Sequence, residues 1–343
     1  MGEDMNPVGD AGLLRYHIPY DVSGNDALQD NIQQILSSRT YTRGENLEAL
    51  IERIKEITQY EFAIPFGSCT TAIMALSRWY RKLGKRKLIT PAFTWLSTYV
   101  PFRWSGFDIQ FVDIDKDTWF ADFSNAKTDK DAVAVAVDTF GSTFPDDLLP
   151  PANEGWIDSA QSLGTRWYGH EANRVISLSA SKIVTSGEGG FILTQDIQLA
   201  NFVNDIQNWF SRMSELNAAL GIAYLDHMDE IIRLKADISR TYRKTHGFDW
   251  QRIPFASNNY IVAGLVPSSS DMRKKNPDWE FRDYYQTMAD ENDETTSFEK
   301  ALYPTVPIHL QSDLAITRYV SRHILAFPSW PQMPLERIEE LRT

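Results

Sequence analysis

The feature that most constrains the fold is a series of short apolar runs, each too short for a typical helix. These runs occupy residues 87–90, 109–112, 132–137, 156–157, 174–178 and 190–193. Several lack the alternation of polar and apolar residues that is typical of a strand with one solvated side. Helical patterns such as those at 47–57 and 72–83 precede or separate them. This order predicts an α/β fold with a mostly parallel sheet that is covered on both faces.

The helical pattern at residues 213–244 contains no proline, and Gly221 is its only weak point. A helix of that length can bridge two lobes, so we expect a boundary near residue 245. The prediction is a large cofactor-binding domain at 1–245 and a small C-terminal domain at 246–343.

Four expectations concern the C-terminal part. Strands are expected at 260–265 and 324–327, and a last helix from Pro334. The segment 266–298, with its acid-rich stretch, is expected to be a surface excursion.

The composition narrows the class of function. A formal net charge of −12 argues against a generic nucleic-acid binder. No run approaches the roughly 20 apolar residues of a membrane span, and the acidic start is unlike a secretory signal. The only cysteine, Cys69, cannot form an internal disulfide, so a cytoplasmic location is expected. Neither a Cys-x-x-Cys zinc site nor a phosphate-binding glycine fingerprint is present, and no metal is expected.

Three elements at predicted strand ends can carry chemistry. Residues 67–71 form a small-residue loop before a helix, which suits a phosphate, although an ordinary turn with a helix cap has the same pattern. Asp158 directly follows an apolar strand, at the edge where open α/β sheets bind their ligands. The alternative is that its carboxylate only accepts a hydrogen bond from a local N–H. Lys182 lies among small residues after the next strand. It is expected to be a partly desolvated amine with a lowered pKa, with a solvated surface lysine as the alternative.

Together the three elements supply what pyridoxal phosphate requires. The lysine bonds to the cofactor aldehyde, the carboxylate keeps the pyridine nitrogen protonated, and the loop holds the phosphate. The combination therefore predicts a pyridoxal-phosphate site, although each element alone is weak evidence for it.

The same motifs resemble the DegT/DnrJ/EryC1/StrS family of sugar aminotransferases, from residue 44 to the C-terminus. The resemblance is carried by segments 67–72, 91–95, 111–115, 158–161, 177–190, 212–221 and 303–309. It implies the type I (aspartate aminotransferase) fold, with a mostly parallel mixed sheet in the large domain and a smaller α+β domain. It also implies pyridoxal phosphate as cofactor and a homodimer with shared active sites.

The resemblance implies a role for individual residues. Lys182 corresponds to the lysine that bonds to the cofactor, and Asp158 to the partner of its pyridinium nitrogen. Gln161 lies beside the ring hydroxyl and Trp95 stacks on the ring, with core packing as the alternative for the tryptophan. His309 matches a histidine near the sugar, with a solvated or capping role as its alternative. The phosphate ligands are Ser68, Cys69, Thr70 and Ser177.

The implied reaction is a ping-pong transamination from an amino acid, expected to be glutamate, to a ketosugar, expected to be nucleotide-linked. Lys182 carries the protons as general base and acid. Three alternatives stay open: a sugar dehydratase of the same family, whose members have histidine at the lysine position; a cofactor-binding or structural relative without turnover; and an oxidoreductase. A ketocyclitol also stays open as the acceptor.

The chain departs from the family at two places. Phe210 stands where an asparagine usually reaches the neighbouring subunit's cofactor phosphate, and Asn208 is a candidate substitute. The segment 195–212 is short where relatives carry a longer substrate-facing loop. These departures bear on the shared phosphate contact and the substrate class rather than on the cofactor.

Overall fold

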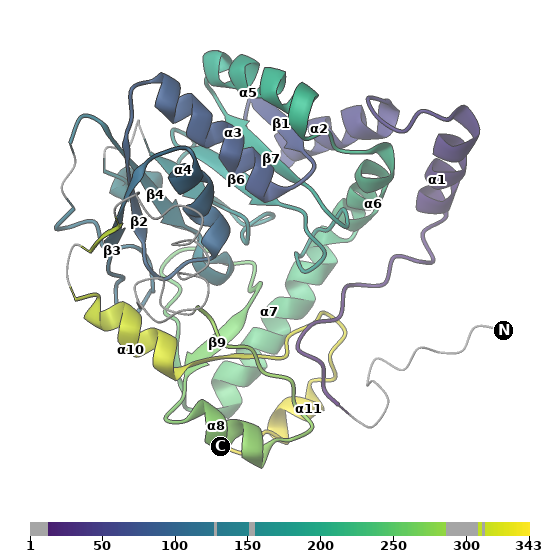
Figure 1. Ribbon diagram of the computed structural model, residues 1–343. Coiled ribbons are helices and arrows are strands. Elements are labelled where there is room, and N and C mark those ends of the chain that lie inside the picture. The colour runs from purple at the N-terminus through teal and green to yellow at the C-terminus, as the bar shows by residue number, and fades with distance from the viewer. Residues whose placement is uncertain (1–12, 127–128, 151–154, 286–307, 311–312) are drawn as a thin grey trace.

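The computed structural model describes residues 13–126, 129–150, 155–285, 308–310 and 313–343. Figure 1 shows a large sheet flanked by helices and, beyond the long helix α7, a smaller sheet. The large sheet has eight strands in the order β1-β7-β6-β5-β4-β2-β3-β10. Their bounds are β1 (Phe62–Phe66), β2 (Lys87–Pro91), β3 (Asp108–Val112), β4 (Ala132–Val137), β5 (Trp156–Asp158), β6 (Asn173–Ser177), β7 (Gly190–Thr194) and β10 (Ile308–Leu310).

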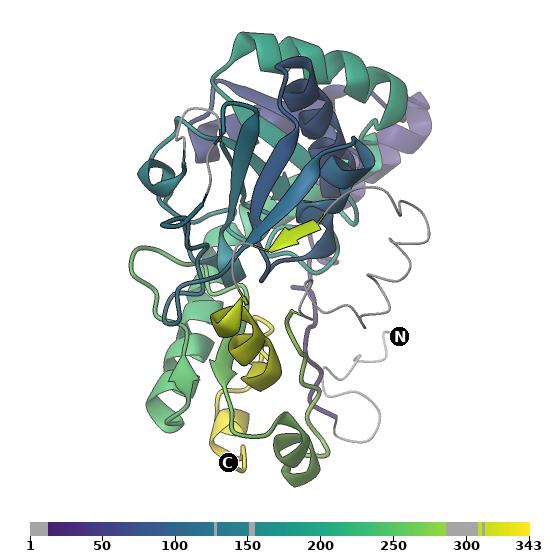
Figure 2. The ribbon, with the colours of Figure 1, turned by 60° about the vertical axis from the view of Figure 1, so that its left-hand side comes forward.

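The sheet is mixed but mostly parallel. β7 is antiparallel to both of its neighbours, β1 and β6, and every other neighbouring pair is parallel. β10 comes late in the chain yet pairs with β3, as Figure 2 shows at the edge of the sheet. The predicted α/β class with a mostly parallel sheet is confirmed.

Continuous apolar sequence places the strands between two packed layers. All six residues of β4 are buried. Val133 and Val135 join the cluster that includes α3, whereas Ala132, Ala134 and Ala136 face a second cluster on the other side. The described helices are α1 (Asp26–Ser38), α2 (Glu45–Thr58), α3 (Cys69–Lys82), α4 (Val100–Trp104), α5 (Ile197–Phe210), α6 (Glu215–Asp226), α7 (Met228–Thr245), α8 (Ser269–Lys275), α10 (Ala315–His323) and α11 (Glu336–Glu339). None of these helices is both long and apolar enough to cross a membrane.

The single helix predicted over 213–244 is two helices, so that prediction is wrong. The break lies at His227, whose ψ of 2° departs from helical values and whose N–H bonds to the Tyr224 carbonyl three residues back. Gly221, the expected weak point, continues α6. A Cβ there would lie 3.3 Å from Leu50, so glycine allows α6 to pack closely against α2.

The small sheet has the order β11-β9-β8, with β8 (Asp249–Trp250), β9 (Val262–Leu265) and β11 (Ile324–Phe327), and both pairs are antiparallel. The predicted strands at 260–265 and 324–327 are therefore present. The last helix, predicted from Pro334, is the short α11. The division into two domains at 1–245 and 246–343 stays a prediction. β10 follows residue 245 in the chain but belongs to the large sheet.

The expectation of a surface excursion at 266–298 is wrong for residues 266–285. Met272, Trp279 and Phe281 are buried in the apolar cluster of the small sheet. Tyr285 is buried in the apolar cluster that also contains Phe191 of the large sheet. Residues 286–298, which include the acid-rich stretch, lie outside the described residues. The many polar residues of 266–285 therefore suggested a surface segment, although several of its large side chains enter the core.

Candidate active site

The carboxyl ends of the parallel strands bound a cavity of about 320 Å³, where open α/β sheets place their ligands. Three tyrosines from the C-terminal part also line it: Tyr260, Tyr284 and Tyr285. The structure brings all eight predicted cofactor-binding residues to this cavity: Ser68, Cys69, Thr70, Trp95, Asp158, Gln161, Ser177 and Lys182. Their shared location is a finding, whereas their individual roles stay predictions.

The loop between β1 and α3 presents hydrogen-bond donors to the cavity. Ser68 is the N-cap of α3, and its Oγ accepts the Thr71 N–H at 3.2 Å. The first amides of a helix have no carbonyl acceptor within it, and this end carries a partial positive charge. Ser177, the last residue of β6, and Ser179, just after it, add two hydroxyls to the same cavity. This donor set fits a phosphate.

Close packing beside the loop requires glycine at the start of β7. A Cβ on Gly190 would lie 2.7 Å from both the N and the Cα of Cys69. The loop is also tied to the chain after α5, because Ser211 Oγ accepts the Gly67 N–H at 3.0 Å and contacts Thr71 Oγ1 at 2.6 Å. The proposed phosphate-binding loop, residues 67–71, is thus held from two sides.

Asp158 is the last residue of β5 and forms a buried acid in the cavity wall. Its Oδ2 accepts the hydroxyl hydrogen of Thr98 at 2.7 Å, and its Oδ1 accepts the Ala160 N–H at 3.1 Å. Burial raises the pKa of Asp158 above its ordinary value, and these two hydrogen bonds and the charge of Lys182 oppose that rise. The hydrogen bonds from Thr98 and Ala160 therefore stabilise the ionised form of Asp158.

Lys182 directs its amine at an aromatic side chain that the sequence analysis missed. Its Nζ donates a hydrogen bond to the Tyr260 hydroxyl at 3.4 Å and lies 4.7 Å from the centre of that ring. Burial lowers the pKa of Lys182, but Tyr260, Cys69 and Asp158 outweigh burial and the pKa is raised. The expectation of a lowered pKa is wrong for this reason. No motif marks Tyr260, because aromatic residues are common in and near strands.

Gln161 is fixed at both ends of its amide. Its Oε1 accepts the Phe140 N–H at 2.7 Å, and its Nε2 donates to the Tyr285 hydroxyl at 2.8 Å. The second contact comes from a segment that was expected to lie on the surface. Tyr285 is another lining residue that sequence reasoning missed, because no local pattern reveals a contact across 124 positions.

The remaining predicted residues have different outcomes. Trp95 is 58% exposed and lines the cavity, so the alternative of core packing is wrong. The backbone of His309 lies in β10 beside Gln110, but its side chain is outside the described residues and its role stays a prediction. Asn208 Oδ1 accepts a hydrogen bond from Arg43 at 2.6 Å, and Phe210 is 82% exposed at the end of α5.

Comparison with known proteins was made for the sequence and for the fold. Residues 23–342 match the sequence profile of the DegT/DnrJ/EryC1/StrS aminotransferase family. A GDP-4-keto-6-deoxy-D-mannose 3-dehydratase of Yersinia pseudotuberculosis is 28% identical over 220 residues, which are 58% of this chain and 56% of the relative. The match to this curated relative thus spans little more than half of its length. A GDP-perosamine synthase of Escherichia coli O157:H7 is 22% identical over 67% of this chain and 71% of the relative.

One solved structure illustrates the likeness of fold. It is that of the E. coli GDP-4-keto-6-deoxy-D-mannose-3-dehydratase with bound hydrated PLP, where PLP is pyridoxal phosphate. Its TM-score is 0.81 at 18% identity, over 96% of this chain and 98% of that one. The fold is the type I aminotransferase fold that the sequence resemblance implies.

Proposed function

Because the chain belongs to the DegT/DnrJ/EryC1/StrS aminotransferase family, we propose that it is a PLP-dependent aminotransferase. Its proposed reaction moves an amino group from an amino acid, glutamate, to a nucleotide-linked ketosugar. The observation that carries this proposal is the presence of Lys182 and Asp158 in one cavity, with helix-start amides and serine hydroxyls at its side. An amine, a buried acid and a phosphate-sized donor set are the three groups that this cofactor needs.

The chemistry of the lining fits PLP, which when bound accepts the electrons released as a substrate C–H bond breaks. Lys182 is the residue that bonds to the cofactor aldehyde carbon. Asp158 holds a proton on the pyridine nitrogen, and its own contacts with Thr98 and Ala160 keep it in place. Trp95 would cover the ring, and Gln161 would lie beside its hydroxyl. The residues that would hold the phosphate are Ser68, Thr70, Ser177 and the first amides of α3, including that of Cys69.

The amine of Lys182 moves the proton in both halves of the reaction. It takes the proton from the donor α-carbon as general base and returns a proton to the sugar carbon as general acid. The Tyr260 hydroxyl, 3.4 Å from Nζ, orients the amine when it is free. Tyr284 and Tyr285 also line the cavity.

A sugar dehydratase is the second candidate, because the curated relative at 28% identity is named a dehydratase. Lys182 is the observation against it, since the resemblance implies histidine at that position in dehydratases of this family. Elimination leaves the sugar without a new amino group, so the product distinguishes the two activities. The aminotransferase remains our proposal.

We further propose a homodimer in the cytoplasm. Trp209 and Phe210 are each 82% exposed, and large exposed aromatic side chains favour an interface. They adjoin an apolar groove of about 570 Å³ whose lining includes Phe66, Met74 and Phe202. Because Ser211 bonds to the phosphate-binding loop, a partner on this surface would lie near the cofactor.

The proposal is tested with the purified protein and added PLP. We expect a yellow chromophore, a borohydride-stable adduct that peptide mapping places on Lys182, and 2-oxoglutarate when glutamate is added. A panel of nucleotide-linked ketosugars then identifies the acceptor by formation of an aminosugar. A protein that stays colourless with PLP, or an adduct at another lysine, contradicts the proposal.

A further inference from the structure

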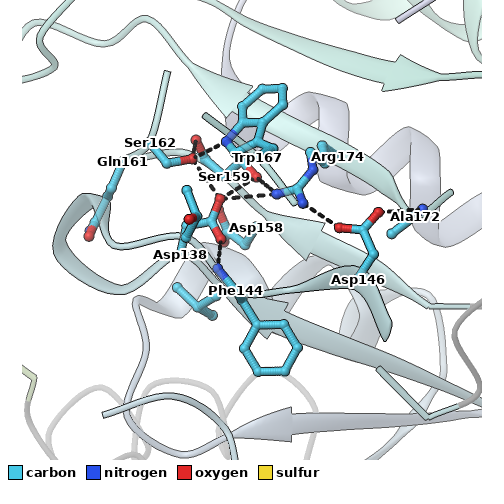
Figure 3. A network of polar contacts seen from close by, with 12 residues as sticks. Asp138, Phe144, Asp146, Asp158, Ser159, Gln161, Ser162, Trp167, Ala172 and Arg174 are labelled. Carbon is cyan, nitrogen blue, oxygen red and sulfur yellow. Dashed lines mark hydrogen bonds and ion pairs between the residues drawn. The ribbon is translucent and has the colours of Figure 1, made fainter. Parts of the chain in front are cut away.

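Behind the cavity, a fully buried arginine lies between two aspartates (Figure 3). Arg174, in β6, is 0% exposed. Its Nη1 donates to Asp138 Oδ2 at 3.1 Å, and its Nη2 donates to Asp146 Oδ1 at 2.5 Å. The guanidinium also lies 4.7 Å from the centre of the Trp167 ring. Removing one partner of a buried ion pair leaves an uncompensated charge in the protein interior, which is strongly destabilising. Arg174, Asp138 and Asp146 therefore act as a unit.

This network holds the loop that carries two of the proposed cofactor contacts. Asp138 Oδ2 accepts the hydroxyl hydrogens of Ser159 at 2.7 Å and Ser162 at 2.6 Å, and Arg174 Nη1 also donates to Ser159 Oγ at 2.9 Å. The Asp138 N–H donates to the Asp158 carbonyl at 3.0 Å. Residues 158–162 are therefore tied to Asp138 at both ends, with Gln161 between the ties.

The same network controls the charge around Asp158. Burial raises the pKa of Asp138, and Arg174 is the main group that opposes this rise. An ionised Asp138 in turn raises the pKa of Asp158, because like charges repel. The other groups that act on Asp158 or feel its charge are Lys182, Cys69 and Tyr285 on the cavity side. Arg174 thus supplies positive charge to this cluster from the protein side.

We infer that Arg174 is a positioning residue for the cofactor site: it pairs with Asp138, whose carboxylate accepts the hydroxyl hydrogens of Ser159 and Ser162 and so anchors the 158–162 loop. This inference rests on the proposed function, because Asp158 and Gln161 of this loop are proposed to contact the cofactor. Arg174 itself does not line the cavity, so its effect passes through Asp138 and the two serines.

The test compares Arg174→Met with the double variant Arg174→Met/Asp138→Asn. PLP is titrated into cofactor-stripped protein and followed by visible absorbance over a range of pH. In Arg174→Met the main group that opposes the raised pKa of Asp138 is gone, so the carboxylate that anchors the loop is protonated at a higher pH. We expect the dissociation constant to rise at least tenfold and the acid limit of binding to move to higher pH. The double variant has no carboxylate at position 138, so we expect its affinity to stay below that of the wild type while its acid limit no longer moves to higher pH.

A second variant covers the case in which Arg174→Met does not fold. Asp138→Asn alone keeps the arginine and removes one negative charge beside Asp158. We expect a weaker affinity than that of the wild type, because the loop loses its carboxylate anchor, and an acid limit moved to lower pH, because the charge that raises the pKa of Asp158 is gone. An unchanged limit, or one moved to higher pH, overturns the inference.

The matched control is an exposed Arg–Asp pair. Arg53 and Asp226 lie 2.9 Å apart with side chains 37% and 43% exposed, so Arg53→Met and Arg53→Met/Asp226→Asn leave PLP affinity unchanged. The inference is overturned if Arg174→Met binds PLP as the wild type does, or if the acid limit of the double variant moves to higher pH as that of the single variant does. Wild-type protein that gains no colour with PLP instead refutes the proposed function, so the two failures are distinguishable.

Discussion

Thr98 donates its hydroxyl hydrogen to the carboxylate of Asp158 across 2.7 Å, and the same hydroxyl lies 2.7 Å from that of Thr94. The segment that follows β2 is thereby connected to the end of β5 through buried side chains alone. Burial raises the pKa of Asp158, and this hydrogen bond is the strongest of the contacts that oppose the rise. The contact therefore affects both the position and the charge of the acid.

Thr98→Val removes the donor while keeping the shape of the side chain. Loss of the hydrogen bond raises the pKa of Asp158 further, so the carboxylate is protonated at a higher pH as the solution is acidified. We expect PLP binding, followed by visible absorbance, to be lost at higher pH than in the wild type. Thr98→Ser, which keeps the hydroxyl, should retain the wild-type profile; equal profiles for the valine and serine variants would contradict the assignment.

Lys182→Arg keeps a positive charge but lacks the primary amine. We expect no borohydride-stable adduct and a fall in glutamate-dependent 2-oxoglutarate formation on the order of 10²–10⁴-fold, the usual contribution of a positioned acid–base group. Lys235→Arg is a control at a second buried lysine, which bonds to the Ser329 carbonyl rather than lining the cavity. A Lys182→Arg variant with the normal rate would exclude the proposed role.

Tyr260→Phe removes the hydroxyl that accepts a hydrogen bond from Lys182 and keeps the ring below the amine. We expect kcat for transamination to fall about tenfold, the scale of one hydrogen bond to a charged group, with a small change in PLP affinity. The measurement is single-turnover kinetics with glutamate beside a PLP titration. If affinity falls and kcat does not, the tyrosine binds the cofactor rather than orienting the amine.

Glu215→Ala tests a structural contact far from the chemistry. The buried Glu215 carboxylate accepts the N–H groups of Gly44, Asn46 and Leu47, and so caps α2 from the start of α6. Losing it leaves the start of α2 uncapped, and we expect a loss of about 2 kcal/mol in the free energy of unfolding by urea.

The control for this prediction is Glu52→Ala, which removes an exposed carboxylate from α2 itself. Glu52 pairs only with Lys55 at the surface, so its loss should change stability by less than about 0.5 kcal/mol. Equal losses in the two variants would show that the cap contributes nothing beyond an ordinary surface charge.

Sequence reasoning was most successful where a local pattern has one physical outcome. Six consecutive apolar residues predicted β4 to its end residues, because a run of that length can be buried on both sides only within a sheet. The motifs around Asp158 and Lys182 likewise predicted that the two residues meet, because the carboxyl ends of parallel strands share one edge. The type I fold followed from the family resemblance rather than from these patterns.

The failures arise where the outcome depends on distant partners. Neither proline nor glycine marks the break at His227, so periodicity alone extends one helix through it. The raised pKa of Lys182 depends on Tyr260, 78 positions away, and the contact of Gln161 with Tyr285 spans 124. The Arg174 network was missed for the same reason, since a lone arginine in an apolar strand has no local partner to reveal it.

The pairing of β10 with β3 has a consequence for synthesis on the ribosome. Ile308 lies beside Ile109, so the open side of β3 waits for a strand that is translated much later. Until then the nascent chain presents free backbone amides and carbonyls along one border, to which a neighbouring nascent chain can add. Slow translation between β3 and β10 therefore prolongs the period in which this border can promote aggregation.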